Sequence, residues 1–217
     1  MREYRILVSW LAAPDLFDMI YSDSIKIETE RLKIKPLSYD ELLLYVKLDN
    51  SLEKRLGLNP HSRSLPDELK EALEQLILPQ VADSGDNILF STLWTIIDKQ
   101  KKLMVGDMCF KGEPNAPGEV EIGYGTYAAF QGNGFMTEAV RAISHWALSQ
   151  AEVQTILAET TKENMSSHKT LSRNGFKAYK HVENMIWWRL DKTKIDDLYI
   201  TSVNQEQTRD EPQDSNI

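Results

Sequence analysis

Alternating hydrophobic and polar positions open the patterned part of the chain. The segment ETERLKIKPL, residues 28–37, alternates around Leu32 and Ile34 as a half-buried strand does. Ser38 and Glu41 follow it with the spacing of a capping box, in which each residue's side chain bonds the backbone N–H of the other. The pattern therefore predicts a strand that leads directly into a first helix over LLLYV.

A longer helical pattern follows in DELKEALEQLIL, residues 67–78. Leu69, Leu73, Leu76 and Ile77 recur at helical spacing, which predicts one apolar face turned toward a core. The helix is introduced by Ser64 and Pro66, which are helix-start signals.

The middle of the chain changes to short β-rich runs. LFSTLWTIID, LMVGDMCFKG and GEVEIGYGTY follow one another, and a charged KQKK turn separates the first two. Consecutive strands joined by short turns are typical of an antiparallel meander.

The last third alternates between strand and helix. A helix is predicted over residues 135–150, a strand over TILAETT, a second helix from about Met165, and β-rich runs over FKAYKHV and MIWWRL. This order predicts a single α+β domain whose C-terminal half contains a parallel strand–helix–strand crossover. We find no internal repeat and no second domain.

Composition narrows the possible partners. The 217 residues are 41% hydrophobic, and 25 basic against 33 acidic residues give a net charge of −8. The only basic cluster is the short KQKK run, which argues against nucleic acid as a partner because phosphate binding needs a coherent positive surface. A cationic substrate is electrostatically easier to accept than an anionic one. Cys109 is the sole cysteine, so no intrachain disulfide and no thiolate metal cluster can form, which fits a reducing compartment such as the cytoplasm.

The two ends of the chain differ from the middle. Residues 1–24 contain the short apolar run ILVSWLAAP, but Glu3 interrupts its basic start and PDLFDM follows where a processing site would be expected. We therefore interpret them as an N-terminal extension rather than a cleaved signal, either an appended segment or the result of a start codon placed upstream of the working one near Met19. No apolar run approaches the ~20 residues that span a bilayer, so no membrane is expected as a partner. Residues 192–217 are interpreted as a polar, solvated tail. The domain is therefore expected over residues 25–191.

A glycine pair lies where the crossover helix begins. In QGNGFMTEA, Gly132 and Gly134 would let an anion approach the backbone N–H groups of residues Asn133 through Thr137, which have no partner inside the helix. The alternative is a tight strand-to-helix turn that needs glycine only for its dihedral angles. The run matches neither the dinucleotide nor the P-loop phosphate motif.

Three segments in series resemble the GNAT superfamily of acyl-CoA-dependent N-acetyltransferases. The run from Gln131 to Ala139 resembles the family's Q/R-x-x-G-x-G/A pyrophosphate-binding signature, EVEIGY resembles the strand beside the acetyl thioester, and ENMSSHKTLSRNGF resembles the family's N-x-x-S/A segment. The resemblance covers about residues 25–190 and points to the branch resembling ribosomal-protein N-terminal acetyltransferases. It implies a GNAT-like mixed, mostly antiparallel sheet with an acetyl-CoA-binding crossover.

The resemblance also implies which residues contact acetyl-CoA. The expected cofactor-binding residues are those of the thioester strand, the glycine loop and the following helix starts: Ile122, Gly123, Tyr124, Gln131, Gly132, Asn133, Gly134, Phe135, Met136, Thr137 and Asn164. A backbone N–H from Ile122 to Tyr124 would stabilise the oxyanion if the strands separate there. The Asn164 amide suits the pantetheine amides, although Asn can equally cap the helix.

Two positions depart from the family pattern. Met136 stands where the family usually has Gly or Ala, so its side chain is expected to turn away from the pyrophosphate and only its N–H is carried over. Leu171 stands where many relatives have the tyrosine proposed to protonate the CoA thiolate, which excludes a tyrosine acid at that position.

Catalysis by direct attack needs an unprotonated amine. Glu119, Glu121 and Gly123 share one face of the EVEIGY strand. We predict that Glu121, with Glu119 as the next candidate, accepts the ammonium proton directly or through water; the alternatives are a solvated carboxylate and a clamp for the substrate ammonium. Ser167 could assist the CoA sulfur, or only satisfy backbone groups at a helix start.

Other reactive side chains lack the company that catalysis requires. Cys109 lies in an apolar strand pattern without a nearby base, so we interpret it as a small buried hydrophobe. The four histidines have no i, i+4 pairing and no cysteine beside them, so no metal is expected. No G-x-S-x-G elbow is present to activate a serine.

The sequence thus predicts an acetyl-CoA-dependent acetyltransferase that acts on a primary amine, either a protein N-terminus or a small molecule. A different acyl-CoA, or a noncatalytic acyl-CoA-binding sensor, is the alternative. The protein is expected to be a monomer or a homodimer.

Overall fold

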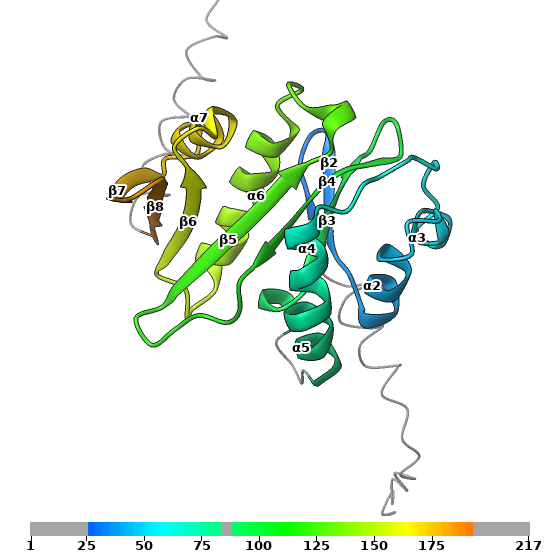
Figure 1. Cartoon of the computed structure of the whole chain (residues 1–217), viewed down its shortest axis with the longest axis horizontal. Coiled ribbons are helices and arrows are strands. Elements are labelled where there is room, and N and C mark those ends of the chain that lie inside the picture. The colour runs from blue at the N-terminus through cyan, green and yellow to red at the C-terminus, as the bar shows by residue number, and fades with distance from the viewer. Residues whose placement is uncertain (1–25, 84–87, 193–217) are drawn as a thin grey trace, which may run out of the picture.

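The computed structural model describes residues 26–83 and 88–192, which form one open sheet with helices on both faces (Figure 1). The strand order is β1-β2-β3-β4-β5-β6-β8-β7. The strands are β1 Ile27–Glu28, β2 Leu32–Pro36, β3 Leu93–Asp98, β4 Leu103–Phe110, β5 Glu119–Thr126, β6 Thr155–Thr161, β7 Lys177–Val182 and β8 Met185–Asp191.

One pair of strands in this sheet is parallel. β5 and β6 run in the same direction, and the other neighbouring pairs are antiparallel. Strand β5 connects to β6 through α6, Phe135–Ser149, which gives the predicted crossover and confirms the α+β class. The meander β3–β4–β5 is also confirmed.

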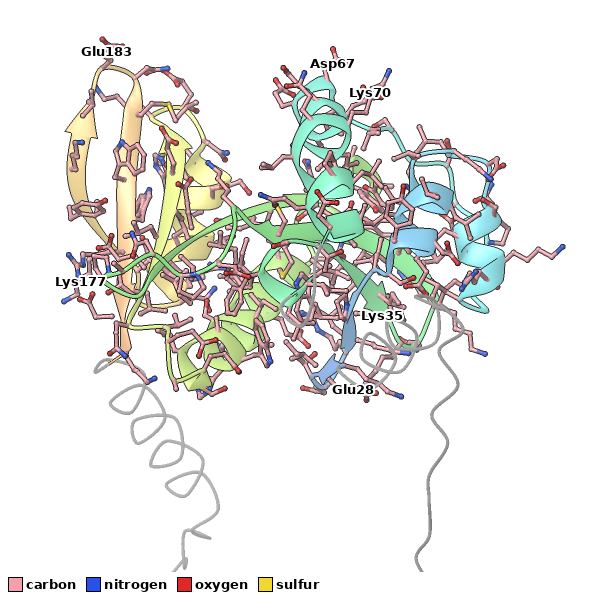
Figure 2. The ribbon with its side chains drawn as sticks, turned by 90° about the horizontal axis from the view of Figure 1, so that it is seen from below. Glu28, Lys35, Asp67, Lys70, Lys177 and Glu183 are labelled. Carbon is pink, nitrogen blue, oxygen red and sulfur yellow. The ribbon has the colours of Figure 1, made fainter. Side chains whose placement is uncertain are left out.

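The helices divide the interior into two cores. The first lies between the sheet and α6, where Ala139, Val140 and Ile143 pack against Val120 and Ile122 of β5. The second lies on the opposite face, under α2 Tyr39–Tyr45, α3 Ser51–Arg55, α4 Asp67–Ala72 and α5 Leu78–Asp83. Figure 2 shows α4, marked by Asp67 and Lys70, rising from that face of the sheet. Helix α7, Met165–Arg173, lies beside α6.

The capping box at the first helix is present as predicted. The Ser38 hydroxyl accepts from the Glu41 N–H at 3.3 Å, and the Glu41 carboxylate accepts from the Ser38 N–H at 3.0 Å. Glu41 also pairs with Lys35 on the preceding strand, at 2.7 Å from Oε2 to Nζ. This pair is almost fully buried, so the sequence signal for the helix start also joins the helix to the sheet.

Two sequence predictions of local structure are corrected. Leu76 is 42% exposed rather than buried with Leu73 and Ile77, because residues Leu73–Ile77 form the π-helical turn η1 and its wider i→i+5 spacing turns Leu76 outward. The β-rich run at residues 89–98 becomes a strand only from Leu93, since a 3₁₀ turn, η2 Ile88–Phe90, occupies its start.

The predicted N-terminal extension and nearly all of the predicted tail lie outside the described residues. Within residues 26–83 and 88–192, no helix combines the length and the apolar character needed to cross a membrane.

Candidate functional site

The parallel strands β5 and β6 separate in the middle of the sheet. Their register runs from Glu119 opposite Thr155 to Glu121 opposite Leu157 and ends there, and the two strands diverge toward the end of β5 (Figure 1). The backbone of Ile122, Gly123 and Tyr124 therefore lies beyond the paired region. This is the strand separation that an oxyanion donor from these residues requires.

The loop that follows β5 turns sharply into α6. Gly132 and Gly134 have φ of 77° and 75°, in the left-handed region that favours glycine. A Cβ at Gly132 would meet nothing within 4 Å, and one at Gly134 would meet the Arg31 guanidinium at 3.6 Å. The dihedral angles alone thus explain the glycines, but the same turn directs the first N–H groups of α6 to the end of the diverging strands, where an anion can bind.

Asn133 in the loop and the first residues of α6 have different structural roles. The Asn133 amide donates to the carbonyls of Phe130, at 3.0 Å, and Gln131, at 3.1 Å, which holds the loop closed. Phe135 and Met136 are each 7% exposed and pack in the first core. The Met136 side chain therefore packs into the core, and the residue also lines the cavity described below.

Helix α7 brings its first turn to the same place. The Asn164 side chain accepts from the Ser167 N–H at 3.1 Å, so it caps the helix and leaves its NH₂ group as a donor. The Tyr124 side chain of β5 reaches Ser167, and burial raises the pKa of the Tyr124 phenol to about 12 while the Ser167 hydroxyl lowers it in part. Tyr124 is therefore a protonated donor at neutral pH. Leu171 is fully buried behind them.

A cavity of about 410 Å³ joins these parts. It is lined by Tyr124, by Gln131, Gly132 and Gly134 of the loop, by the α6 start up to Thr137, and by Asn164, Ser167, Lys169 and Arg173 on the α7 side. Two cationic side chains and no carboxylate are among its lining residues. We call it the basic cavity. With the helix start it is suited to a ligand that carries several negative charges.

A second cavity of about 490 Å³ lies on the α4 face of β5. Its lining includes Tyr45, Glu68, Leu69, Asp107, Cys109, Gly123 and Tyr127. Two carboxylates and no cationic side chain are among its lining residues, so we call it the acidic cavity. The two cavities share Tyr124, Gly125, Thr126 and Gln131, so they meet across the end of β5.

The acidic cavity has a carboxylate with unusual electrostatics. Asp107 is 4% exposed, and burial raises its pKa to about 6. The Tyr45 hydroxyl donates to Oδ2 at 2.6 Å. The Tyr127 and Thr95 hydroxyls face the same carboxylate and help to lower its pKa, although neither makes a close hydrogen bond to Oδ1. A buried, incompletely satisfied carboxylate in a cleft is a characteristic feature of functional sites.

The two glutamates predicted as proton acceptors lie outside both linings. Glu121 points to the α4 face, as predicted from the strand period, and forms an ion pair with Lys111. Glu119 lies at the start of β5, where Asn115 Nδ2 donates to its carboxylate at 3.2 Å. The catalytic assignment of Glu121, Glu119 and Ser167 stays a prediction. Only Ser167 among them lines a cavity.

Sequence reasoning missed the residues that give the cavities their charge. Lys169 and Arg173 are four residues apart in α7 and lie three and seven residues after Ser166, and that spacing could have placed them on one helix face with Ser166. Asp107 and Tyr45 come from segments 62 residues apart, and no local pattern connects them. Within residues 26–83 and 88–192, no group of three or more His, Cys, Asp or Glu is placed to hold a metal ion.

Comparison with known proteins gives a consistent result. Residues 31–177 match the family described as Acetyltransferase (GNAT) domain. The uncharacterized N-acetyltransferase YjdG of Bacillus subtilis (strain 168) is 30% identical over 152 residues, which cover 70% of this chain and 89% of that protein.

Solved structures with the same fold are more distant in sequence. The ribosomal-protein-S5-alanine acetyltransferase from Vibrio fischeri has a TM-score of 0.56 at 18% identity, with 77% of this chain and 97% of that chain covered. A ribosomal L7/L12 alpha-N-protein acetyltransferase in complex with coenzyme A has a TM-score of 0.54 at 14% identity, with 77% and 98% covered.

The match to the family spans most of the described domain and includes the diverging strands, the glycine loop and the starts of α6 and α7. The protein belongs to the GNAT family and is an acetyltransferase.

Proposed function

We propose that the protein transfers the acetyl group of acetyl-CoA to a primary amine, a protein N-terminus or a small-molecule amine, by direct attack. The observation that carries this proposal is the meeting of a basic and an acidic cavity across Tyr124, Gly125 and Thr126. An anionic acyl donor and a cationic acceptor would bind on opposite faces of one strand, with their reacting groups at its end.

The basic cavity fits the charged part of acetyl-CoA. The N–H groups at the start of α6 would bind the pyrophosphate, and Lys169 and Arg173 would pair with phosphate oxygens. The free NH₂ of Asn164 would donate to a pantetheine carbonyl. A backbone N–H from Ile122 to Tyr124 would donate to the oxygen of the thioester as it becomes an oxyanion.

The chemistry transfers one acyl group and removes two protons from the nitrogen. The ammonium loses its first proton before attack, and its nitrogen then forms a bond to the acetyl carbon. The carbon–sulfur bond breaks with its electron pair on the CoA sulfur, the nitrogen loses its second proton to give the amide, and the sulfur takes up one proton to give the thiol. Glu121 would accept the ammonium proton through water, since it lies on the acceptor face but outside the cavity lining. Ser167, beside the protonated Tyr124, would donate to the leaving sulfur.

The acceptor class follows from charge. Proteins with this fold include one named for an alanine of ribosomal protein S5 and one named as a spermidine N-acetyltransferase, and both acceptors are primary amines. The acidic cavity has no cationic side chain in its lining, so it would admit either kind of amine.

The direct test uses purified protein, acetyl-CoA and a panel of polyamines, other small amines and peptides with free N-termini. We expect release of CoA thiol that depends on the amine. Propionyl-CoA in a parallel series tests the choice of acyl group. Tight binding of acetyl-CoA in calorimetry without turnover on any amine would contradict the proposal and favour the noncatalytic sensor.

A further inference from the structure

Asp107 is the most deeply buried carboxylate of the acidic cavity. It lies beside Gly123 and Gly125 on the α4 face of the sheet. Asp107 on β4 is the register partner of Gly125, and Cys109 is the partner of Gly123, so all four residues face the same side. A Cβ at Gly125 would meet nothing within 4 Å. The two glycines therefore leave open space over the two β4 side chains.

The buried ionised side chains around this space carry a net negative charge. The Arg63 guanidinium pairs with Glu53 at 2.8 Å, and both side chains are 2% exposed. Arg63 also stacks on the Tyr45 ring, with 4.3 Å from its guanidinium carbon to the ring centroid. Because Glu53 already neutralises Arg63, Asp107 adds a negative charge that has no cation of its own among the described residues.

The other groups that face Asp107 are neutral hydrogen-bonding side chains. Tyr45 comes from α2, Thr95 is the register partner on β3, and Tyr127 follows β5. Burial raises the pKa values of Tyr45 and Tyr127, so both phenols keep their protons at neutral pH. The Tyr127 and Thr95 hydroxyls lie close enough to the Asp107 carboxylate to help lower its pKa, but neither makes a close hydrogen bond to Oδ1. A ligand with several N–H donors would satisfy Oδ1 and could also donate to the Tyr127 oxygen.

We propose that Asp107 is the anchor of the acceptor site and binds the primary ammonium of the substrate before transfer. This inference rests on the proposed acetyl transfer and names the acceptor class: a single primary ammonium carried on a compact group that fits about 490 Å³. The apolar side chains of Leu69 and Leu93 would contact the group that carries the ammonium. Exposed Glu68 lies at the rim and adds attraction that water screens.

Cys109 provides a reporter that needs no turnover. It is the only cysteine of the chain and lines the acidic cavity. Its thiolate attacks the sulfenyl sulfur of a methanethiosulfonate reagent, which forms a mixed disulfide and releases methanesulfinate with the electron pair. The aminoethyl reagent carries a primary ammonium, and the sulfonatoethyl reagent of similar size carries a negative charge. The ratio of their labelling rates, each divided by its rate on free cysteine, measures the preference of the cavity for an ammonium.

We expect wild-type protein to favour the ammonium reagent by about tenfold or more. Asp107→Asn keeps an acceptor for Tyr45 and should lower the ratio at least about fivefold, whereas the rim variant Glu68→Gln should change it by less than about twofold. Gly125→Val keeps the charge and fills the space, so it should slow both reagents while the ratio stays near wild type. An equal ratio in wild type and Asp107→Asn, with both proteins folded by circular dichroism, would overturn the proposal.

Protection from labelling distinguishes the sources of the ammonium. Butylamine and a trialanine amide are added as competitors, with butanol and the N-acetylated peptide as matched neutral controls. If butylamine or the trialanine amide protects Cys109 from labelling in wild type but not in Asp107→Asn, the result supports Asp107 as the anchor. The competitor that protects shows whether the ammonium comes from a small amine or a peptide N-terminus. Protection by the neutral controls to the same degree would count against it. Failure of the proposed acetyl transfer leaves these rates unchanged, so the two claims fail separately.

Discussion

Two side chains on opposite sides of β5 carry the predicted proton transfers. Glu121 lies on the acceptor face in an ion pair with Lys111, and Ser167 lies on the donor face beside Tyr124. The first would receive a proton from the amine and the second would give one to the leaving sulfur. Their separation across the strand would keep the two transfers on opposite sides of the thioester.

Glu121→Gln should preserve acetyl-CoA binding and lower turnover most at mildly acidic pH, where fewer amines are unprotonated. The matched control is Lys111→Met, which breaks the same ion pair but leaves the carboxylate. Turnover is measured from pH 6 to pH 9 with saturating acetyl-CoA. A pH–rate profile identical to wild type in Glu121→Gln would assign the proton to solvent or to Glu119.

Ser167→Ala should reduce turnover by roughly tenfold to a hundredfold with little change in acetyl-CoA affinity. The reduction is modest because a thiolate leaves without a proton more easily than an alkoxide does. Melting temperature, cofactor affinity and single-turnover rate are measured on the same variant. A lower melting temperature with a wild-type single-turnover rate would mean that the hydroxyl only satisfies local backbone groups.

At the scale of elements, two helix starts converge on the diverging strands. Helix α6 contributes its unpaired N–H groups, and α7 contributes Asn164, Ser167, Lys169 and Arg173. The α7 cations have no carboxylate beside them in the basic cavity, so their charge is available to phosphate.

Replacing both Lys169 and Arg173 with Gln should raise the Kd for CoA by about tenfold to a hundredfold, because two charge-assisted contacts are lost. The Kd for acetyl-pantetheine, which has no phosphate, should not change. Isothermal calorimetry at low and high salt measures both. Equal losses for the two ligands would show that the change disrupts the cavity rather than phosphate binding.

Local signals predicted most elements, and the failure in the second helix came from tertiary packing that no local signal reports. The capping box of Ser38 and Glu41 and the periodicity of residues 135–150 are complete within a few neighbouring residues, so they could be interpreted without tertiary context. The π-turn at Leu73–Ile77 could not, because the sequence fits an ordinary helix equally well and packing against the second core selects the wider turn.

At the scale of the whole molecule, the candidate site also combines contiguous motifs with residues that only folding brings together. The glycine loop and the N-x-x-S segment are each continuous in the sequence, and residues of both line the basic cavity. The acidic cavity is assembled from α2, α4, β4 and β5, which meet only after folding. Asp107 therefore looked like one polar residue in a strand until its neighbours Tyr45, Thr95 and Tyr127 were placed around it.

The charge of Asp107 should be costly to stability. Burial raises its pKa from the ordinary 3.8 to about 6, so the folded protein binds that proton more tightly than the unfolded chain. The resulting stability is fully present below about pH 4 and is lost as the pH rises through 6. Wild type should lose about 2 kcal/mol relative to Asp107→Asn between about pH 4 and pH 7. Urea unfolding of both proteins across this range measures the difference, and a constant difference would contradict the raised pKa.

The central claim is that acetyl transfer occurs across β5, from a donor in the basic cavity to an amine in the acidic one. The most direct measurement attaches an amine covalently inside the acidic cavity. Cys109 is labelled with the aminoethyl reagent, acetyl-CoA is added, and the mass of the labelled peptide is measured by mass spectrometry. We expect one added acetyl group on the tethered amine, which reduction releases as N-acetylcysteamine. When Lys169 and Arg173 are both replaced by Gln, we expect no acetyl group on the tethered amine at limiting acetyl-CoA. A tethered amine that stays unacetylated while the unlabelled enzyme acetylates free amines would contradict it.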